Sequence, residues 1–228
     1  MIDALSAVTT APRTEDRRPG LLAAVEVTVA VAVVLLDVGL PSLILCVLAG
    51  LSLAVRHQGP SSLGIRRARR AHLLVGTAVV ALVWSVFQLA VTMPLANHLS
   101  GEKQDVGVFA DVEGDLSLFL LLVLLSWTLG AIVEEIAFRG FLLTRVREVL
   151  GNGRAALIAA VIVTSVLFGL LHSEQGVVGV VAVALDGVVF CALRVYFGTV
   201  WAPVLAHGFN NTLGLATFFV VGPVYGFW

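Results

Sequence analysis

Two adjacent carboxylates, Glu134 and Glu135, stand in an apolar stretch that continues as IAFRG. On a helix, Glu135 and Arg139 are four residues apart, so they share a face and can form an ion pair that holds Glu135 ionised. Glu134 points about 100° away from that face and lacks this partner. A carboxylate in a poorly solvated site without a cation is suited to general acid–base catalysis. Glutamates that only neutralise arginines at a membrane edge would show the same EExxxR pattern, so this motif alone leaves both interpretations open.

Two histidines have a partner one helical turn away. Phe168 and His172 are four residues apart in FGLLH, and His207 and Asn211 are four residues apart in HGFNN. Each histidine is therefore expected to face inward together with its partner. A single histidine in a membrane helix is more often a hydrogen-bonded interior residue, but two of them beside a carboxylate pair favour a shared site.

These side chains together could hydrolyse an acyl bond. Glu134 with His172 can activate a water, while His207 and Asn211 can either help to hold a divalent metal or donate hydrogen bonds to a developing oxyanion. Motifs for a competing nucleophile or zinc site, such as G-x-S-x-G and H-E-x-x-H, do not occur in the sequence. The predicted chemistry is therefore hydrolysis by an activated water.

The elements that must position these residues are membrane helices. Of the 228 residues 59% are hydrophobic and only 13% are charged, which is far from the composition of a soluble domain. A helix needs about 20 apolar residues to cross a bilayer, or about 17 where the span is short. We predict an all-α bundle of about seven spans, with eight helices as an alternative, over 21–37, 40–55, 72–94, 116–138, 155–172, 176–196 and 201–222. The first two are short, so a re-entrant pair remains an alternative to two crossings.

The arginines predict the orientation of this bundle, because Lys and Arg prefer the cytoplasmic side of a membrane. With a cytoplasmic N-terminus, the inner side receives all of the arginines: Arg13, Arg17, Arg18, Arg56, Arg66, Arg67, Arg69, Arg70, Arg139, Arg145, Arg147, Arg154 and Arg194. The acidic loop with the single lysine, Lys103, then lies outside. The basic run RRARR also allows binding to anionic lipid or nucleic acid, but its inner position already explains it, so no nucleic-acid partner is expected.

We expect one domain without internal repeats. It divides into a polar cytoplasmic tail (1–20), N-terminal transmembrane helices and loops (21–114), a catalytic core (115–222) and a C-terminal tail (223–228).

Other unusual residues in the spans have simpler explanations. An ionisable side chain at mid-membrane costs about 2.5 to 3.5 kcal/mol on insertion scales, so each one needs a reason. Glu26 and Asp37 lie near span ends and can reach headgroups or water, whereas Asp186 is expected to be a buried acid that is hydrogen-bonded across helices. Cys46 and Cys191 have no thiol or histidine at ligand spacing and are expected to be small interior residues.

EEIAFRG, FGLLH and WAPVLAHGFNN carry the motifs EExxxR, FxxxH and HxxxN in this order. In them the sequence resembles the CPBP family of intramembrane proteases, also called Abi, which is named for CAAX prenyl protease and bacteriocin-processing members and includes lysostaphin-resistance-protein-A-like proteins. The resemblance covers about residues 115 to 220. It implies a multi-pass membrane endopeptidase, in a bacterial-type plasma membrane, that acts on a membrane-associated peptide or protein in CAAX-type processing, peptide maturation or bacteriocin immunity.

The resemblance also implies residue roles. Glu134 matches the water-activating glutamate, His172 its histidine partner, and His207 with Asn211 the third motif. The supporting positions are Glu135, Arg139 and Phe168. The family is described as metal-dependent, and a metal-free glutamate mechanism has also been argued for it. Zn²⁺ held by Glu134, His172 and His207 therefore stays an open alternative.

Two other functions remain as alternatives. A non-catalytic immunity or scaffold protein of the same fold could use the polar cluster only to bind a partner. A secondary transporter or proton channel also needs buried acids and histidines, but no inverted repeat is visible.

The predicted depths of the site residues conflict. At about 1.5 Å per residue, Glu134 and His207 lie within about two turns of the inner surface, whereas His172 lies at the far end of its span. Either the fourth and fifth helices project into the cytoplasm around LLTRVREVLGNGR, which brings His172 to the level of the others, or the cavity is deeper and tilted. We predict the first, because the charged residues of this stretch are tolerated only in water. The shallow positions of Glu134 and His207 favour a cavity that opens on the inner face.

Overall fold

The computed structural model describes residues 17–67, 70–151 and 153–228, and all regular secondary structure in this part of the chain is helical. Residues 1–16 of the predicted polar tail, together with Arg69, lie outside the described residues. Four helices are long and apolar enough to span a membrane: His72–Ser100, Leu116–Leu150, Ser173–Phe197 and Trp201–Val221. Three shorter apolar helices cover Gly20–Leu35, Pro41–Val55 and Arg154–Leu170. The prediction of an all-helical membrane bundle is confirmed.

Several of these apolar stretches are built from more than one element. The described chain forms α1 (Arg17–Leu35), α2 (Pro41–Val55), α3 (Arg70–Phe87), α4 (Met93–Ser100), α5 (Leu116–Leu125), α6 (Leu143–Leu150), α7 (Arg154–Leu170), α8 (Gly176–Phe197) and α9 (Trp201–Val221). A π-helical segment, η3 (Gln88–Thr92), joins α3 to α4 without a break, and the segments η5 (Ser126–Glu134) and η6 (Ile136–Leu142) join α5 to α6.

The third and fourth spans are longer than predicted. The fourth was expected to end at residue 138, but its helix continues to Leu150 and covers 35 residues, or roughly 50 Å at the α-helical rise. Hydropathy alone placed the end too early, because the arginines that follow interrupt the apolar run without interrupting the helix. The α6 end of this helix therefore reaches well beyond the apolar span.

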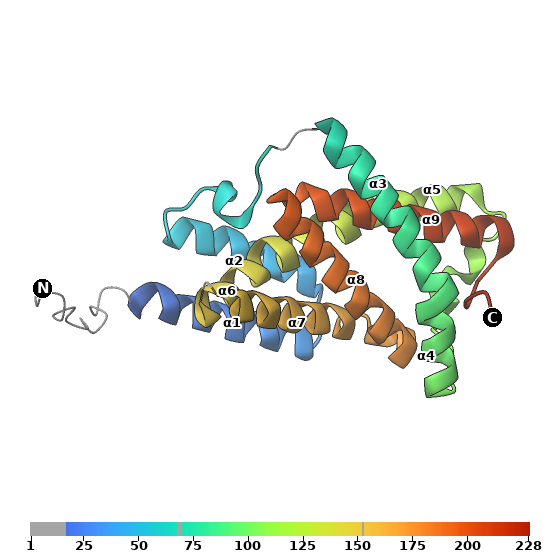
Figure 1. Cartoon of the computed structure of the whole chain (residues 1–228), viewed down its shortest axis with the longest axis horizontal. Helices are drawn as coiled ribbons and strands as arrows, with labels where there is room; N and C mark the ends of the chain where they lie inside the picture. The colour runs from blue at the N-terminus through green and yellow to red at the C-terminus, as the bar shows by residue number, and fades with distance from the viewer. Residues whose placement is uncertain (1–16, 68–69, 152) are drawn as a thin grey trace, which may run out of the picture.

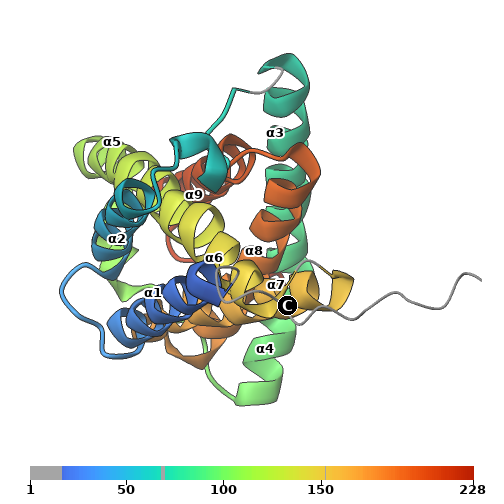
Figure 2. The ribbon, with the colours of Figure 1, turned by 90° about the vertical axis from the view of Figure 1, so that its left-hand side faces the viewer.

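Most helices run along the long axis of the molecule, alternating in direction (Figure 1). Seen along that axis, α1, α2, α5 and α9 appear close to end on (Figure 2). α7 packs against α8, α3 crosses α9, and α1 packs against α6. This arrangement brings the three helices with the chemical motifs into one bundle.

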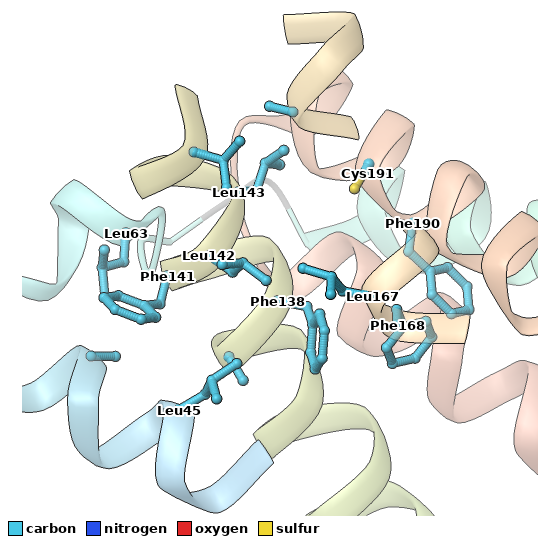
Figure 3. Close-up of a cluster of buried hydrophobic side chains, with 14 of the residues drawn as sticks. Leu45, Leu63, Phe138, Phe141, Leu142, Leu143, Leu167, Phe168, Phe190 and Cys191 are labelled. Carbon is cyan, nitrogen blue, oxygen red and sulfur yellow. The ribbon is translucent and has the colours of Figure 1, made fainter. Parts of the chain in front are cut away.

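The packed core lies around the second half of the long helix. Phe138, Phe141 and Leu142 are completely buried, and they meet Leu45 of α2 and Phe168 of α7 (Figure 3). Cys46 and Cys191 are free cysteines within the bundle, half-buried and buried respectively. The interpretation of both as small interior residues is thus confirmed.

Glu26 has a more specific role than the sequence suggested. Its carboxylate lies 2.8 Å from Arg56 and 3.2 Å from Arg145, and the same two arginines reach Glu148 at 2.7 and 3.0 Å. The side chains of Arg56 and Arg145 are almost fully buried. The expectation that Glu26 only reaches headgroups or water is therefore wrong, because this ion-pair network ties α1, the end of α2 and α6 together.

Gly208, next to His207, allows α9 to approach the helix that carries the carboxylates. A Cβ at Gly208 would lie 2.6 Å from the ring of Trp127, closer than packed carbon atoms allow. We expect Gly208→Ala to lower the free energy of unfolding by about 1 to 3 kcal/mol, the usual range for overpacking. Gly214→Ala on the same helix is the matched control, because nothing lies within 4 Å of its Cβ position. Equal unfolding midpoints for the two variants in detergent would contradict this packing argument.

Candidate active site

Glu135 is the centre of a buried charged cluster. Its Oε1 lies 2.9 Å from Nη1 of Arg139 and 2.9 Å from Nδ1 of His207, and neither Glu135 nor Arg139 is more than 1% exposed. The predicted pairing of Glu135 with Arg139 is therefore observed. The bond to His207 was not predicted, and it links the first motif directly to the third.

Aromatic rings enclose the cations of this cluster. The guanidinium carbon of Arg139 lies 4.0 Å from the ring centre of Phe168, a distance at which a ring face attracts a cation. Phe190 stacks on the His207 imidazole with ring centres 5.0 Å apart. Nε and Nη2 of Arg139 have no hydrogen-bond partner among the described residues, so the rings take the place of polar ligands. Phe168 therefore supports the site by holding Arg139.

Oε2 of Glu135 is buried without a hydrogen-bond partner in the described chain, but its Oε1 pairs with Arg139 and His207. Glu134 has no such ion pair among the described residues. Its Oε2 is buried and makes no hydrogen bond within the described chain. Glu134 ends the π-helical segment η5, and η6 begins two residues later. π-Helical turns are rare and occur often at functional sites. The altered turn means that the direction of Glu134 could not be derived from α-helical geometry alone.

His172 lies at the carboxyl end of α7 and contacts the same group of rings. Its Nδ1 lies 3.0 Å from the carbonyl oxygen of Phe168, and the two rings are 5.1 Å apart. Since a carbonyl oxygen only accepts, Nδ1 must carry a proton, and the lone pair of the neutral ring is on Nε2. In His207 the bond to Glu135 likewise leaves Nε2 available. In both imidazoles, Nε2 is thus the nitrogen that remains available for a further hydrogen bond.

The conflict in depth is resolved by the hairpin of α6 and α7. The long helix continues past Arg139 to Leu150, turns at Gly151, and α7 returns from Arg154, so that Phe168 arrives opposite Arg139. The relative positions of these two helices are therefore those that were predicted for the fourth and fifth helices. His172 follows one turn later and reaches the level of the two glutamates.

All four predicted catalytic residues line one cavity. It has a volume of about 430 Å³, and its walls include Glu134, His172, His207 and Asn211. Glu134 is close enough to both imidazoles to interact with them electrostatically. Three helices that are separate in the sequence thus place an acid, two imidazoles and an amide around one space.

The cavity does not extend in the predicted direction. Its walls continue from His207 toward the loop after α4, where Gln104, Val106 and Phe109 contribute. These walls lead away from the arginine-rich end, where the cavity was expected to open. Glu134 and His207 lie at the end of the cavity that is nearest to the packed core.

Further polar residues in the cavity were not predicted from the sequence. Asp186 was expected to be hydrogen-bonded across helices, and it does accept bonds from Trp84 and Gln88. Ser85 donates to Asn210 at 2.6 Å, and both residues belong to the cavity wall. The signal in the sequence was weak: Ser85 and Gln88 are polar residues three apart in an apolar span. Only packing shows that they lie opposite Asp186 and Asn210.

The arrangement of donors does not fit a metal centre. The described residues contain no group of three or more His, Cys, Asp or Glu side chains that could hold a metal ion. The proposed zinc ligands Glu134, His172 and His207 share the cavity without forming such a group.

Comparison with known proteins gives one finding. Residues 116–213 match the family described as type II CAAX prenyl endopeptidase Rce1-like. This match agrees with the resemblance drawn from the three motifs, all of which lie inside the matched stretch. No curated protein and no solved structure matches the chain.

Proposed function

Because residues 116–213 belong to the Rce1-like family of CAAX prenyl endopeptidases, we propose that this protein is an intramembrane endopeptidase that uses Glu134 as its general base. The family is one of proteases that act on membrane-associated substrates, and the described chain has four helices that are long and apolar enough to span a membrane. The finer proposal concerns the residues and the mechanism.

One observation carries this proposal. The carboxylate of Glu134 has a buried oxygen without a partner, and it faces a cavity that His172, His207 and Asn211 also line. An unpaired buried oxygen is costly, so a group in this state needs a ligand that completes its hydrogen bonds. A water bound between Glu134 and Nε2 of His172 would satisfy it and would be ready for activation.

The reaction then follows from the available protons. Glu134 takes a proton from the water as its oxygen bonds to the substrate carbonyl carbon. The amide of Asn211 and the protonated ring of His207 donate hydrogen bonds to the oxyanion, and Glu135 stabilises the charge on that ring. When the C–N bond breaks, the proton passes from Glu134, directly or through His172, to the leaving amine. The products are a carboxylate and an amine.

The experiment that tests this function is a comparison of peptide termini in membranes of wild-type cells and of cells that carry Glu134→Ala. We expect at least one terminus to be lost in Glu134→Ala and also in His172→Ala. Identical sets of termini in all three strains, at equal protein levels, would rule out the protease and leave a scaffold role. The lost terminus also supplies the sequence of a peptide substrate for kinetics.

Chelation tests the choice between side-chain and metal chemistry. Because the described donors do not form a three-ligand group, we expect treatment with EDTA or 1,10-phenanthroline to leave cleavage within about twofold of the untreated rate, whereas loss of a catalytic metal removes several kcal/mol of stabilisation. The measurement is the cleavage rate of purified protein with metal analysis of the same sample. Loss of activity that returns with Zn²⁺ would show that zinc takes part.

A further inference from the structure

Three arginines from separate elements gather where α6, the end of α8 and the connection between α2 and α3 meet. Arg147 lies on α6, Arg194 in the last turn of α8, and Arg66 in the connection that follows η2 (Pro60–Leu63). Arg66 and Arg147 both lie close enough to Arg194 to interact with it electrostatically. We call these three residues the arginine triad. Because like charges repel, a fold that brings three guanidinium groups together needs an anion that compensates them.

The described part of the chain supplies no such anion. None of its acids forms an ion pair with the triad. Glu148, next to Arg147 in the sequence, pairs instead with Arg56 and Arg145. The Nε atoms of Arg147 and Arg194 are buried and make no hydrogen bond within the described chain. Buried donors without a partner are costly, so these two indicate a ligand that accepts hydrogen bonds and carries negative charge.

Two glycines make room for the side chains of the triad. A Cβ atom at Gly64 would collide with the guanidinium group of Arg194, and one at Gly198 would collide with that of Arg66. Both glycines also have a positive φ, +79° and +66°, which other residues rarely adopt. Nε of Arg66 donates a hydrogen bond to the carbonyl oxygen of Gly198 at 2.6 Å. Two guanidinium groups are thus held against the backbone.

The connections that carry the triad are joined to each other. The backbone N–H of Val200 donates to the carbonyl oxygen of Gly64 at 3.0 Å, and Oγ1 of Thr199 donates to the carbonyl oxygen of Arg66 at 2.8 Å. In Figure 2, the connection between α2 and α3 lies beside the turn between α8 and α9. These bonds fix Arg66 relative to the end of α8, so this part of the site is built before a ligand arrives.

The surroundings of the triad favour a lipid over a free ion. Exposed apolar side chains lie within three residues of both helical arginines: Val149, Leu150, Val195 and Tyr196. Acyl chains can cover such side chains, whereas a free ion cannot. The predicted orientation puts this end of the bundle at the cytoplasmic leaflet, where anionic lipids gather. The planar fork of an arginine also matches the geometry of a phosphate group.

We propose that the arginine triad binds the phosphate group of an anionic phospholipid. The phosphate oxygens accept hydrogen bonds from the two unpartnered Nε atoms, and the negative charge offsets the repulsion between the guanidinium groups. The bound lipid joins the end of α8 to α6, which continues the helix that carries Glu134.

Lipid titration followed by native mass spectrometry tests this site. The purified protein is kept in a neutral detergent and receives either phosphatidylglycerol, which is charged only at its phosphate, or phosphatidylcholine, which adds a quaternary ammonium group. We expect the first phosphatidylglycerol molecule to bind at least about tenfold more tightly than phosphatidylcholine, because the triad attracts the net negative charge and repels the ammonium group. Equal Kd values for the two lipids in the wild type would overturn the proposal, whatever the variants show.

Two variants and a control separate a built site from general attraction by positive charge. Arg147→Gln and Arg194→Gln are each expected to raise the Kd of the first phosphatidylglycerol molecule by at least about tenfold, since each removes a charged donor. Arg154→Gln removes the same charge from an exposed position at the start of α7, at the same end of the bundle, and should change the Kd by less than about twofold.

Equal losses in all three variants would show that only net charge matters and would overturn the proposal. Unfolding midpoints are measured for each variant. If one variant does not fold, the other carries the comparison with Arg154→Gln, and if neither folds, the lipid preference of the wild type decides.

Inorganic phosphate identifies the carrier of the phosphate group. It is added at millimolar concentration to the lipid-free protein, and the unfolding midpoint in detergent is followed. Selective binding of phosphatidylglycerol without a shift by inorganic phosphate assigns the site to a lipid, as proposed. A midpoint that rises with inorganic phosphate in the wild type but not in Arg194→Gln, without any lipid preference, would assign the site to a free ion and overturn the lipid. None of these measurements depends on catalysis.

Discussion

Glu134→Gln is expected to reduce the rate of peptide cleavage by about 10² to 10⁴-fold, the usual contribution of a general base. The amide has almost the shape of the carboxylate but cannot take a proton from water. Because the Oε2 atom of Glu134 has no hydrogen-bond partner within the described chain, the substitution breaks no hydrogen bond of that atom. The loss should therefore appear in kcat, with an unfolding midpoint close to that of the wild type.

Glu174→Gln is the matched control for this experiment. Glu174 is an exposed acid in the turn that follows His172, and its change to glutamine should leave cleavage within about twofold, as is usual for surface positions. Both rates are measured on the purified protein in liposomes, with the peptide identified from the lost terminus. Full activity of Glu134→Gln would remove Glu134 from the mechanism and would leave no described carboxylate in its place except Glu135 or Asp186.

Arg139→Met is expected to have the largest effect on stability, a loss of about 3 to 5 kcal/mol, because it leaves the buried carboxylate of Glu135 without its cation. Both side chains are almost completely buried, and their oxygen and nitrogen lie 2.9 Å apart. The free energy of unfolding is measured by denaturant titration in detergent micelles. Arg154→Met, at an exposed position on α7, is the control and should change it by less than about 0.5 kcal/mol.

A double variant separates the charge from the volume of the side chain. In Glu135→Gln with Arg139→Met no uncompensated charge remains, so part of the lost stability should return relative to Arg139→Met alone. Equal losses in the single and the double variant would show that packing of Arg139 against Phe168 dominates and that the ion pair contributes little. Activity is expected to stay low in both variants, since Glu135 also holds His207.

Several features of the fold were accessible from the sequence because they depend on local composition. Hydrocarbon demands about 20 apolar residues per span, so the apolar runs themselves marked the helices. The pairing of Glu135 with Arg139 was equally accessible, because residues four apart meet on one helix whatever surrounds them. The three motifs predicted which residues gather in one site, since few ionisable side chains are tolerated in such spans.

Tertiary structure decided how these residues are divided into roles. The bond between His207 and Glu135 and the stacking of Phe190 on His207 depend on where α8 and α9 cross the long helix. No periodicity in the sequence shows those crossings. The π-helical turns around Glu134 also escaped prediction, since they add a residue to the turn without any signal in hydropathy.

The packing at one end of the cavity shows most clearly what the sequence can determine and what only the tertiary structure determines. Charge placement along the chain predicts which end of each helix faces the cytoplasm, because basic residues are costly to translocate. The sequence could not determine which end of the bundle is packed shut. That depends on Phe138, Phe141 and Phe190 filling the same layer from different helices, and complementary packing of this kind exists only once the helices have assembled.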